Sequence, residues 1–259
     1  RIDLEKLRDA VREDTIVVSM MYVNNEIGAV QDIAALSRVV KEKNPKTYVH
    51  VDAIQAFGKY HIYPKRMGID MLSVSSHKLH GPKGVGLLYI DDKVKIVPII
   101  YGGGQQKGMR SGTDNVTGIA GFGLAAKMTY DHLDEKIEKM YALKRRLVDG
   151  LMEIQDVHIH GMAVEEGAPH IVSAAFVGVR SEVLLHTLEE RGIYVSAGSA
   201  CSTHKRNASP TMQAIQAPKT LTEATVRFSF SETTTEEEID YALGVIKEIV
   251  PMLRRYTRH

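Results

Sequence analysis

The chain has 259 residues, of which 44% are hydrophobic and 25% charged, the balance of a globular protein with one large domain or two ordinary ones. The net charge of +1 gives no electrostatic case for binding nucleic acid or a membrane surface, and no apolar run approaches the roughly 20 residues of a membrane-spanning helix. The single cysteine, Cys201, excludes an internal disulfide and favours a reducing, cytoplasmic compartment.

The first half of the chain alternates predicted strands and helices. Short runs rich in Val, Ile, Met or Leu predict strands at 15–23, 48–53, 71–75 and 85–90, and amphipathic patterns predict helices at 4–12 and 32–43. This alternation favours a mostly parallel sheet with covered faces, hence an α/β fold. The fourth strand follows the third through the tight turn GPKG, so it is expected to run antiparallel.

The pattern changes after the glycine-rich stretch 102–112. Helices are predicted at 115–128, 134–153, 181–191 and 235–256, and strands at 170–177, 193–196 and 224–230. This composition predicts a smaller α+β unit. We place the boundary near Asp131, so the expected domains are residues 1–131 and 132–259.

The stretch SVSSHKLHGPKG places Lys78 just past the end of the third predicted strand. Parallel strands present ligands at their carboxyl ends, and a lysine there can form a Schiff base with a carbonyl, most commonly the aldehyde of pyridoxal phosphate. Asp52, at the end of the second strand, suits a protonated pyridine nitrogen, and Gln55 could donate to the ring hydroxyl. The alternatives are a surface lysine in a turn and an aspartate that caps a helix.

Two further stretches carry candidate ligand contacts. In VNNEIGAVQDI, Asn24 and Asn25 could supply side-chain amides to a ring and Gly28 permits a close turn; a plain turn is the alternative. In YGGGQQKGMRSGT, Thr113 and backbone N–H groups could hold a phosphate, with added charge from Arg110; a flexible loop is the alternative.

The stretch VSAGSACSTHKR surrounds the only cysteine with small residues, which is the composition of a loop and not of a core. The cations His204, Lys205 and Arg206 follow Cys201 and would stabilise a thiolate, which favours a reactive thiol over buried filler. Arg227 lies on a predicted strand in TVRFSF and needs an anionic partner. That partner is either a substrate carboxylate or a structural acid.

Taken together and in this order, the motifs resemble those of cysteine desulfurases: VNNEIG, VDAIQAFGK, SVSSHKLHGPKGVG, GGGQQKGMRSGT, GSACS and ATVRFS. Cysteine desulfurases are pyridoxal-phosphate enzymes of the class V aminotransferase group, with fold type I, of the kind that supplies iron–sulfur cluster assembly. The resemblance covers essentially the whole chain. It implies a large cofactor-binding domain and a small carboxyl-terminal domain with the cysteine loop.

The resemblance implies catalytic and substrate-binding residues by position. Lys78 resembles the Schiff-base lysine, which also moves the α-proton, and Cys201 resembles the nucleophile that becomes a persulfide. His77 is the third implied catalytic residue. For the substrate carboxylate, the resemblance implies Asn25 and Arg227.

The resemblance also implies a set of pyridoxal 5'-phosphate contacts on the ring nitrogen, the ring hydroxyl and the phosphate. The residues are Asn25, Asp52, Gln55, Ser75, His77, Lys78 and Thr113. Thr113 matches a threonine that reaches the phosphate of the neighbouring subunit, which implies a homodimer. No metal site is predicted, because His158 and His160 in the run HIH lack further ligands and are interpreted as strand-edge residues.

The implied reaction converts L-cysteine to L-alanine and passes persulfide sulfur to an acceptor protein, either an iron–sulfur scaffold or a tRNA-thiolation enzyme. Two alternatives remain open. One is a selenocysteine lyase or another class V lyase, and the other is a non-catalytic scaffold that only binds partners.

The chain departs from the family pattern in three places. Ser76 stands where many relatives have Gly, and the basic stretch STHKRNASPTM lacks the usual Glu-Pro-Ser, which leaves the acceptor open. The family's earlier segment, with a glycine-rich phosphate turn and a ring-stacking histidine, would precede Arg1. We therefore expect the 259-residue chain to be a truncated form that binds the cofactor weakly and is inactive alone.

Overall fold

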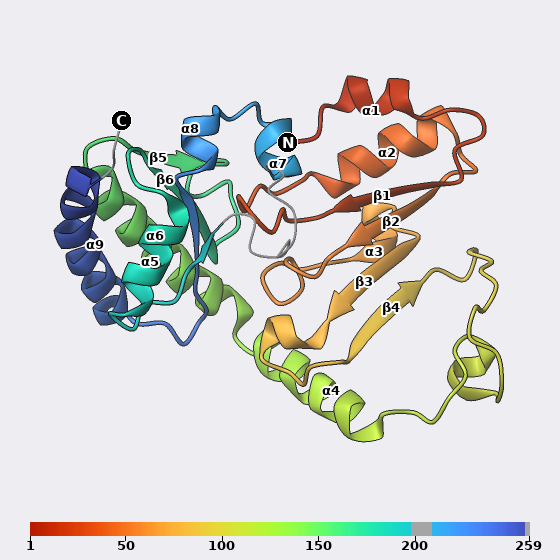
Figure 1. The fold of residues 1–259 in the computed structure, drawn as a ribbon. Helices are drawn as coiled ribbons and strands as arrows, with labels where there is room; N and C mark the ends of the chain where they lie inside the picture. The colour runs from red at the N-terminus through yellow and green to blue at the C-terminus, as the bar shows by residue number, and fades with distance from the viewer. Residues whose placement is uncertain (198–208, 257–259) are drawn as a thin grey trace. The chain divides into compact units, whose positions relative to one another are not determined.

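The computed structural model describes residues 1–197 and 209–256, and the chain divides into two compact units (Figure 1). Unit 1 comprises Arg1–Val23 and Gln31–Leu133, and unit 2 comprises Asn24–Val30 and the chain from Asp134 onward. In the described part of the chain, no helix is both long and apolar enough to span a bilayer.

Unit 1 is built on a four-stranded sheet with the strand order β1-β2-β3-β4. The strands are β1 (Val17–Met21), β2 (Tyr48–Asp52), β3 (Met71–Ser75) and β4 (Gly86–Ile90). The first three are parallel and β4 is antiparallel to β3, as the sequence predicts. The predicted first strand is too long at both ends, because the chain pairs with β2 only over Val17–Met21.

The sheet of unit 1 has one buried and one less buried face. Along β2 and β3, Val49, Val51, Leu72 and Val74 are buried, whereas the residues between them are half-buried. This alternation follows from the two-residue period of a strand. The helices of unit 1 are α1 (Leu4–Ala10), α2 (Ile33–Lys43), α3 (Pro64–Met67) and α4 (Val116–Tyr130), with short 3-10 turns η1 (Ser76–Leu79) and η2 (Gln105–Gly108).

Helix α2 lies along the sheet of unit 1 in Figure 1 and shows why this segment is helical. The Asp32 side chain caps it by accepting a hydrogen bond from the backbone N–H of Ala35 (3.0 Å). Ile33, Leu36 and Val40 recur at helical spacing and are buried. The helix therefore begins and ends close to the predicted limits.

Unit 2 contains an antiparallel sheet with the strand order β5-β6-β8-β7. The strands are β5 (Val157–His160), β6 (Ile171–Phe176), β7 (Ser196–Ala197) and β8 (Thr225–Ser229). The central strand β6 is buried along its whole length, and Phe176 packs edge-on against Phe228 of β8 with ring centroids 6.4 Å apart. The main core of unit 2 lies on the face of β6 that carries Val172, Ala174 and Phe176.

The helices of unit 2 are α5 (Leu133–Met152), α6 (Ser181–Glu189), α7 (Pro210–Ala214), α8 (Lys219–Thr222) and α9 (Glu236–Tyr256). Three of them lie close to the predicted ranges, and α7 and α8 have no counterpart in the prediction. The strand expected at 193–196 is reduced to Ser196–Ala197, and β5 was not predicted as an element. Helices of four or five residues have too few turns to produce a readable periodic pattern.

Lys144 of α5 is a lysine inside the core of unit 2. It is 5% exposed, and its ammonium group donates to the carbonyl oxygen of Ala168 (2.9 Å). Desolvation lowers the pKa of Lys144 to about 8, and nearby Glu165 offsets part of this effect. The folded state therefore releases this proton at a lower pH than the unfolded chain does. As a result, the contribution of Lys144 to the free energy of unfolding rises between about pH 8 and 10.5.

We expect Lys144→Met to remove this gain. From pH 7 to pH 10.5, the unfolding free energy of the wild type should rise by about 3 kcal/mol relative to that of the variant. The reason is that one pKa unit corresponds to about 1.4 kcal/mol. Urea unfolding across this pH range measures it. Lys139→Met is the matched control, since Lys139 is an exposed lysine of α5 that also donates to a backbone carbonyl, that of Glu232. A pH-independent difference for Lys144→Met would contradict the prediction.

Candidate active site

Several of the candidate residues follow the carboxyl ends of β2 and β3. Asp52 is the last residue of β2 and pairs in register with Ser73 of β3, and Ser75 is the last residue of β3. Because β2 and β3 are parallel, their carboxyl ends share one edge of the sheet. This edge is where open α/β sheets bind ligands.

Lys78 and His77 lie in η1, directly after β3. Ser76 and Leu79 of this turn are buried, which anchors it, and His80 with a positive φ of 62° ends it. The two side chains between the anchors, His77 and Lys78, are exposed. In the part of the chain that the structure describes, no acid or other polar group pairs with the Lys78 amine.

The Asp52 carboxylate is half-buried and has one oxygen in use. Its Oδ1 accepts a hydrogen bond from the backbone N–H of Ile54 (2.9 Å), which holds the turn that carries Gln55. Oδ2 makes no hydrogen bond with any described residue. Asp52 therefore supports a local turn and does not cap a helix, which the alternative interpretation expects, and it keeps one oxygen available for a ligand.

Thr113 is exposed on the segment between η2 and α4, which follows β4. β4 runs antiparallel to β3 and ends away from Lys78, but the chain returns before α4, which packs against η1 and lies with Gly118 beside Val85 at the start of β4. Thr113 makes no hydrogen bond with the other candidates among the described residues, and its contact with a neighbouring subunit stays a prediction.

Arg227 of β8 belongs to unit 2 and donates only to neutral oxygens. Its guanidinium donates to the carbonyl oxygen of Asn25 (2.7 Å) and to the hydroxyl of Ser196 (3.2 Å). Its Nε is buried without a partner, and no carboxylate of the described residues lies within ion-pair distance. A half-buried cation without an acid is costly, so the alternative of a structural ion pair finds no support among the described residues and the group is suited to bind an anion.

The stretch Asn24–Val30 is the second part of the site in unit 2. The Asn24 side chain accepts hydrogen bonds from the backbone N–H groups of Glu26 and Ile27 (both 2.9 Å), and Gly28 adopts a φ of 65°. A Cβ atom on Gly28 would come within 3.1 Å of the Ile171 side chain, so a glycine is needed at this turn. The Asn25 side-chain amide has no partner among the residues described.

Cys201 lies outside the described residues, within 198–208. The histidine run HIH forms β5, an edge strand, and His160 shares a hydrogen bond with the Thr225 hydroxyl (3.0 Å). Among the described residues, no group of three or more His, Cys, Asp or Glu side chains is arranged to hold a metal.

Sequence reasoning missed three residues around these groups: Ser196, Glu26 and Ser209. Ser196 holds Arg227, and Glu26 accepts from the Ser209 hydroxyl. One of them, Ser209, could have been found from the sequence. A serine followed by a proline, here Pro210, is typical of a helix start, with the serine as the cap and the proline in the first turn.

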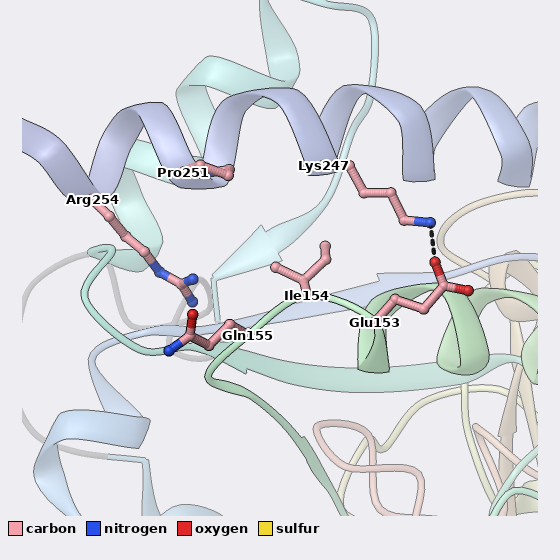
Figure 2. Close-up of a pocket in the computed structure, with 6 residues that line it drawn as sticks. All are labelled: Glu153, Ile154, Gln155, Lys247, Pro251 and Arg254. Atoms are coloured by element: carbon pink, nitrogen blue, oxygen red, sulfur yellow. Dashed lines mark hydrogen bonds and ion pairs between the residues drawn. The ribbon is translucent and has the colours of Figure 1, made fainter.

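A pocket of about 470 Å³ in unit 2 is distinct from these groups. Figure 2 shows it between the end of α5 and α9, with an ion pair of 2.6 Å between Lys247 and Glu153 at one end. None of its lining residues is a candidate site residue. They are Glu153, Ile154, Gln155, Lys247, Pro251 and Arg254.

The residues present fit pyridoxal phosphate. The carboxyl edge of the unit 1 sheet offers a carboxylate with a free oxygen, a primary amine without a partner and a hydroxyl, from Asp52, Lys78 and Ser75. These are the groups that suit a pyridine nitrogen, an aldehyde and a phosphate. Ser76 does not obstruct this donor set, since its buried hydroxyl fills the space where a Cβ of Gly81 would lie (2.1 Å).

We expect Arg227→Ala to weaken binding of an amino-acid carboxylate without altering cofactor binding. The lost interaction is charge-assisted and partly desolvated, so about 2–4 kcal/mol, or roughly 30- to 1000-fold in KM or Kd for L-cysteine, should be lost. Arg254→Ala is the matched control, because Arg254 likewise donates only to neutral oxygens, the backbone carbonyls of Val177 and Asp156. An unchanged KM would show that Arg227 serves only the fold.

Known proteins share the sequence pattern and the fold of this chain. The family model described as Aminotransferase class-V matches residues 1–242. The chain is 39% identical over 255 residues to cysteine desulfurase IscS of Clostridium botulinum, covering 98% of this chain and 64% of that protein. It is 41% identical to cysteine desulfurase IscS of Photobacterium profundum, covering 98% of this chain and 62% of that one.

A solved NifS-like protein superimposes with a TM-score of 0.89 at 39% identity, covering 97% of this chain and 66% of that chain. The predicted α/β fold of type I, with a mostly parallel sheet, is thereby confirmed, as is the resemblance to cysteine desulfurases. The chain spans a little less than two thirds of the length of the curated relatives that it matches. With its motifs, its fold and the family model in agreement, the chain belongs to the class-V aminotransferase family.

Proposed function

We propose that the protein is a pyridoxal-phosphate-dependent cysteine desulfurase, which converts L-cysteine to L-alanine and leaves the sulfur as a persulfide on Cys201. The observation that carries this proposal is the placement of Asp52 and Lys78 after adjacent parallel strands, at one edge of the sheet. The relatives named cysteine desulfurase IscS support the choice of L-cysteine over other amino acids.

The unit 1 residues would serve the cofactor. When bound, pyridoxal phosphate supplies an electron-withdrawing ring that acidifies the α-hydrogen of an attached amino acid. Asp52 would keep the ring nitrogen protonated through its free oxygen, and Gln55 would donate to the ring hydroxyl. Lys78 would hold the cofactor's aldehyde and accept the α-proton, while Ser75 and His77 would contact the phosphate.

The unit 2 residues would serve the substrate. Arg227 and the free amide of Asn25 would bind its carboxylate, for which the orphaned Nε of Arg227 provides a donor. The Cys201 thiolate would attack the substrate sulfur, so that an S–S bond forms as the Cβ–S bond breaks and the carbon is protonated to give alanine. The stretch His204–Arg206 would keep this thiol ionised.

The remaining assignments are also part of this proposal. Residues 1–131 would form the cofactor-binding domain and 132–259 the domain of the cysteine loop. Thr113 would reach the phosphate of a second subunit in a homodimer, in keeping with its exposure. The persulfide would pass in the cytoplasm to an acceptor protein, an iron–sulfur scaffold or a tRNA-thiolation enzyme.

The test is the release of alanine from L-cysteine, and of sulfide in the presence of a thiol reductant. It is run on the 259-residue chain and on a longer form that extends before Arg1, each with added pyridoxal phosphate, and absorbance follows cofactor binding. We expect equal amounts of alanine and sulfur from the longer form. Preference for L-selenocysteine would favour a selenocysteine lyase, and a colourless protein without turnover in either form would favour a scaffold.

A further inference from the structure

Glu26 makes contacts that neither the fold nor the proposed chemistry accounts for. Its carboxylate accepts hydrogen bonds from two hydroxyls, that of Ser209 at 2.5 Å and that of Thr211 at 3.0 Å. Ser209 is only 6% exposed, and its backbone lies more than 180 positions from Glu26 in the sequence. Among the described residues no cation pairs with this carboxylate, and a carboxylate shared by two hydroxyls is an acceptor suited to fix two donors in place.

The donor and the acceptor of each hydrogen bond in this cluster are defined. The Ser209 oxygen accepts from the backbone N–H groups of Thr211 and Met212, so its single hydrogen points to Glu26. The Thr211 oxygen accepts from the Asn24 side-chain amide (3.3 Å), so its hydrogen also points to Glu26. The carboxylate is the end of both hydrogen-bond chains, and it accepts from both hydroxyls.

The same two stretches also pack through apolar side chains. Ile27 and Ala29 form a buried cluster with Met212 of α7, and the partly buried Met162 packs against it. Asn24–Val30 is thus joined to the start of α7 by polar and apolar contacts. Glu26 directly follows Asn25, whose carbonyl oxygen accepts from Arg227, and Ser209 directly follows residues 198–208 with Cys201.

We propose that Glu26 is a positioning residue that ties the chain following Cys201, at Ser209 and Thr211, to the stretch that carries Asn25. This inference rests on the proposed function for the roles of Asn25 and Cys201. Glu26 contacts neither cofactor nor substrate; it acts through Ser209 and Asn24. Its charge keeps the carboxyl end of the cysteine segment registered with the residues that hold the substrate carboxylate.

The first variant is Glu26→Gln. The new amide is neutral and has one oxygen, so it can accept from only one of the two hydroxyls, and its NH₂ group can donate only to Thr211, because the Ser209 oxygen already accepts two N–H groups. Both charge-assisted bonds of the carboxylate are therefore lost. Hydrogen exchange of the peptides 24–30 and 209–214 should accelerate about tenfold, since a hydrogen bond to a charged group contributes roughly 1.5–3 kcal/mol. Persulfide formation on Cys201 should slow by a similar factor, with pyridoxal-phosphate affinity unchanged.

The second variant separates the helix cap from the contact with Glu26. Ser209→Asp keeps a good capping side chain on α7 but sets a second carboxylate against Glu26, so it should disturb both stretches. Adding Glu26→Gln to Ser209→Asp supplies an amide donor to the introduced carboxylate and should restore slow exchange and persulfide formation. Glu248→Gln, which removes the carboxylate of a surface pair with Arg191 (3.2 Å), is the matched control.

Hydrogen exchange needs neither cofactor nor turnover, so its outcome is independent of the proposed function. Rapid exchange in each single variant and recovery in the double variant would support the positioning role. Wild-type exchange in Glu26→Gln, or a double variant no better than Ser209→Asp, would overturn it. If the wild type of the longer form turned over no cysteine while the exchange pattern held, the proposed function would fail and the structural tie would stand.

Discussion

A Lys78→Ala variant is expected to lose the covalent link to pyridoxal phosphate and all measurable turnover of L-cysteine. The lysine follows β3 in an anchored turn, and its amine has no partner among the described residues that would hold it in a structural role. Loss of a general base alone costs about 10²–10⁴-fold in rate, and loss of the cofactor link adds to this.

The measurement is borohydride reduction of the cofactor-loaded protein, followed by peptide mass spectrometry to find the labelled lysine. Lys83→Ala is the matched control, because Lys83 is an exposed lysine in the turn that follows η1. Label at another lysine in Lys78→Ala, with turnover preserved, would show that Lys78 is a surface residue of the turn.

Cys201→Ser should abolish persulfide formation and leave cofactor binding intact. Cys201 is the only thiol in the 259 residues, so no other side chain of the chain can take the sulfur, and a serine hydroxyl is not ionised near neutral pH. Mass spectrometry after incubation with L-cysteine should find one added sulfur atom on the wild type and none on the variant.

Ser202→Ala is the control for Cys201→Ser, since it changes the neighbouring side chain and spares the thiol. Retention of the cofactor absorbance in Cys201→Ser is part of the expected result. Sulfur transfer at the wild-type rate by Cys201→Ser would mean that the thiol has no catalytic role.

Local signals in the sequence were sufficient for most regular elements. β3 was predicted with its observed limits, and β4 was predicted to be antiparallel from the short GPKG turn, because parallel neighbours need a long crossover. Long helices such as α9 were recognised because their apolar period is repeated over many turns. The strand β5 was not among the predicted elements, because its apolar alternation, Val157 and Ile159 between histidines, covers only four residues and is too short to define a strand by itself.

The sequence by itself determined the family of this protein and the adjacency of Asp52 and Lys78, because both follow directly from short motifs and from strand order along the chain. Only the tertiary structure decided the surroundings of Arg227 and Glu26. Their contacts with Asn25 and Ser209 join positions far apart in the chain. Such contacts depend on how a whole unit packs, and the spacing of neighbouring residues carries no record of them.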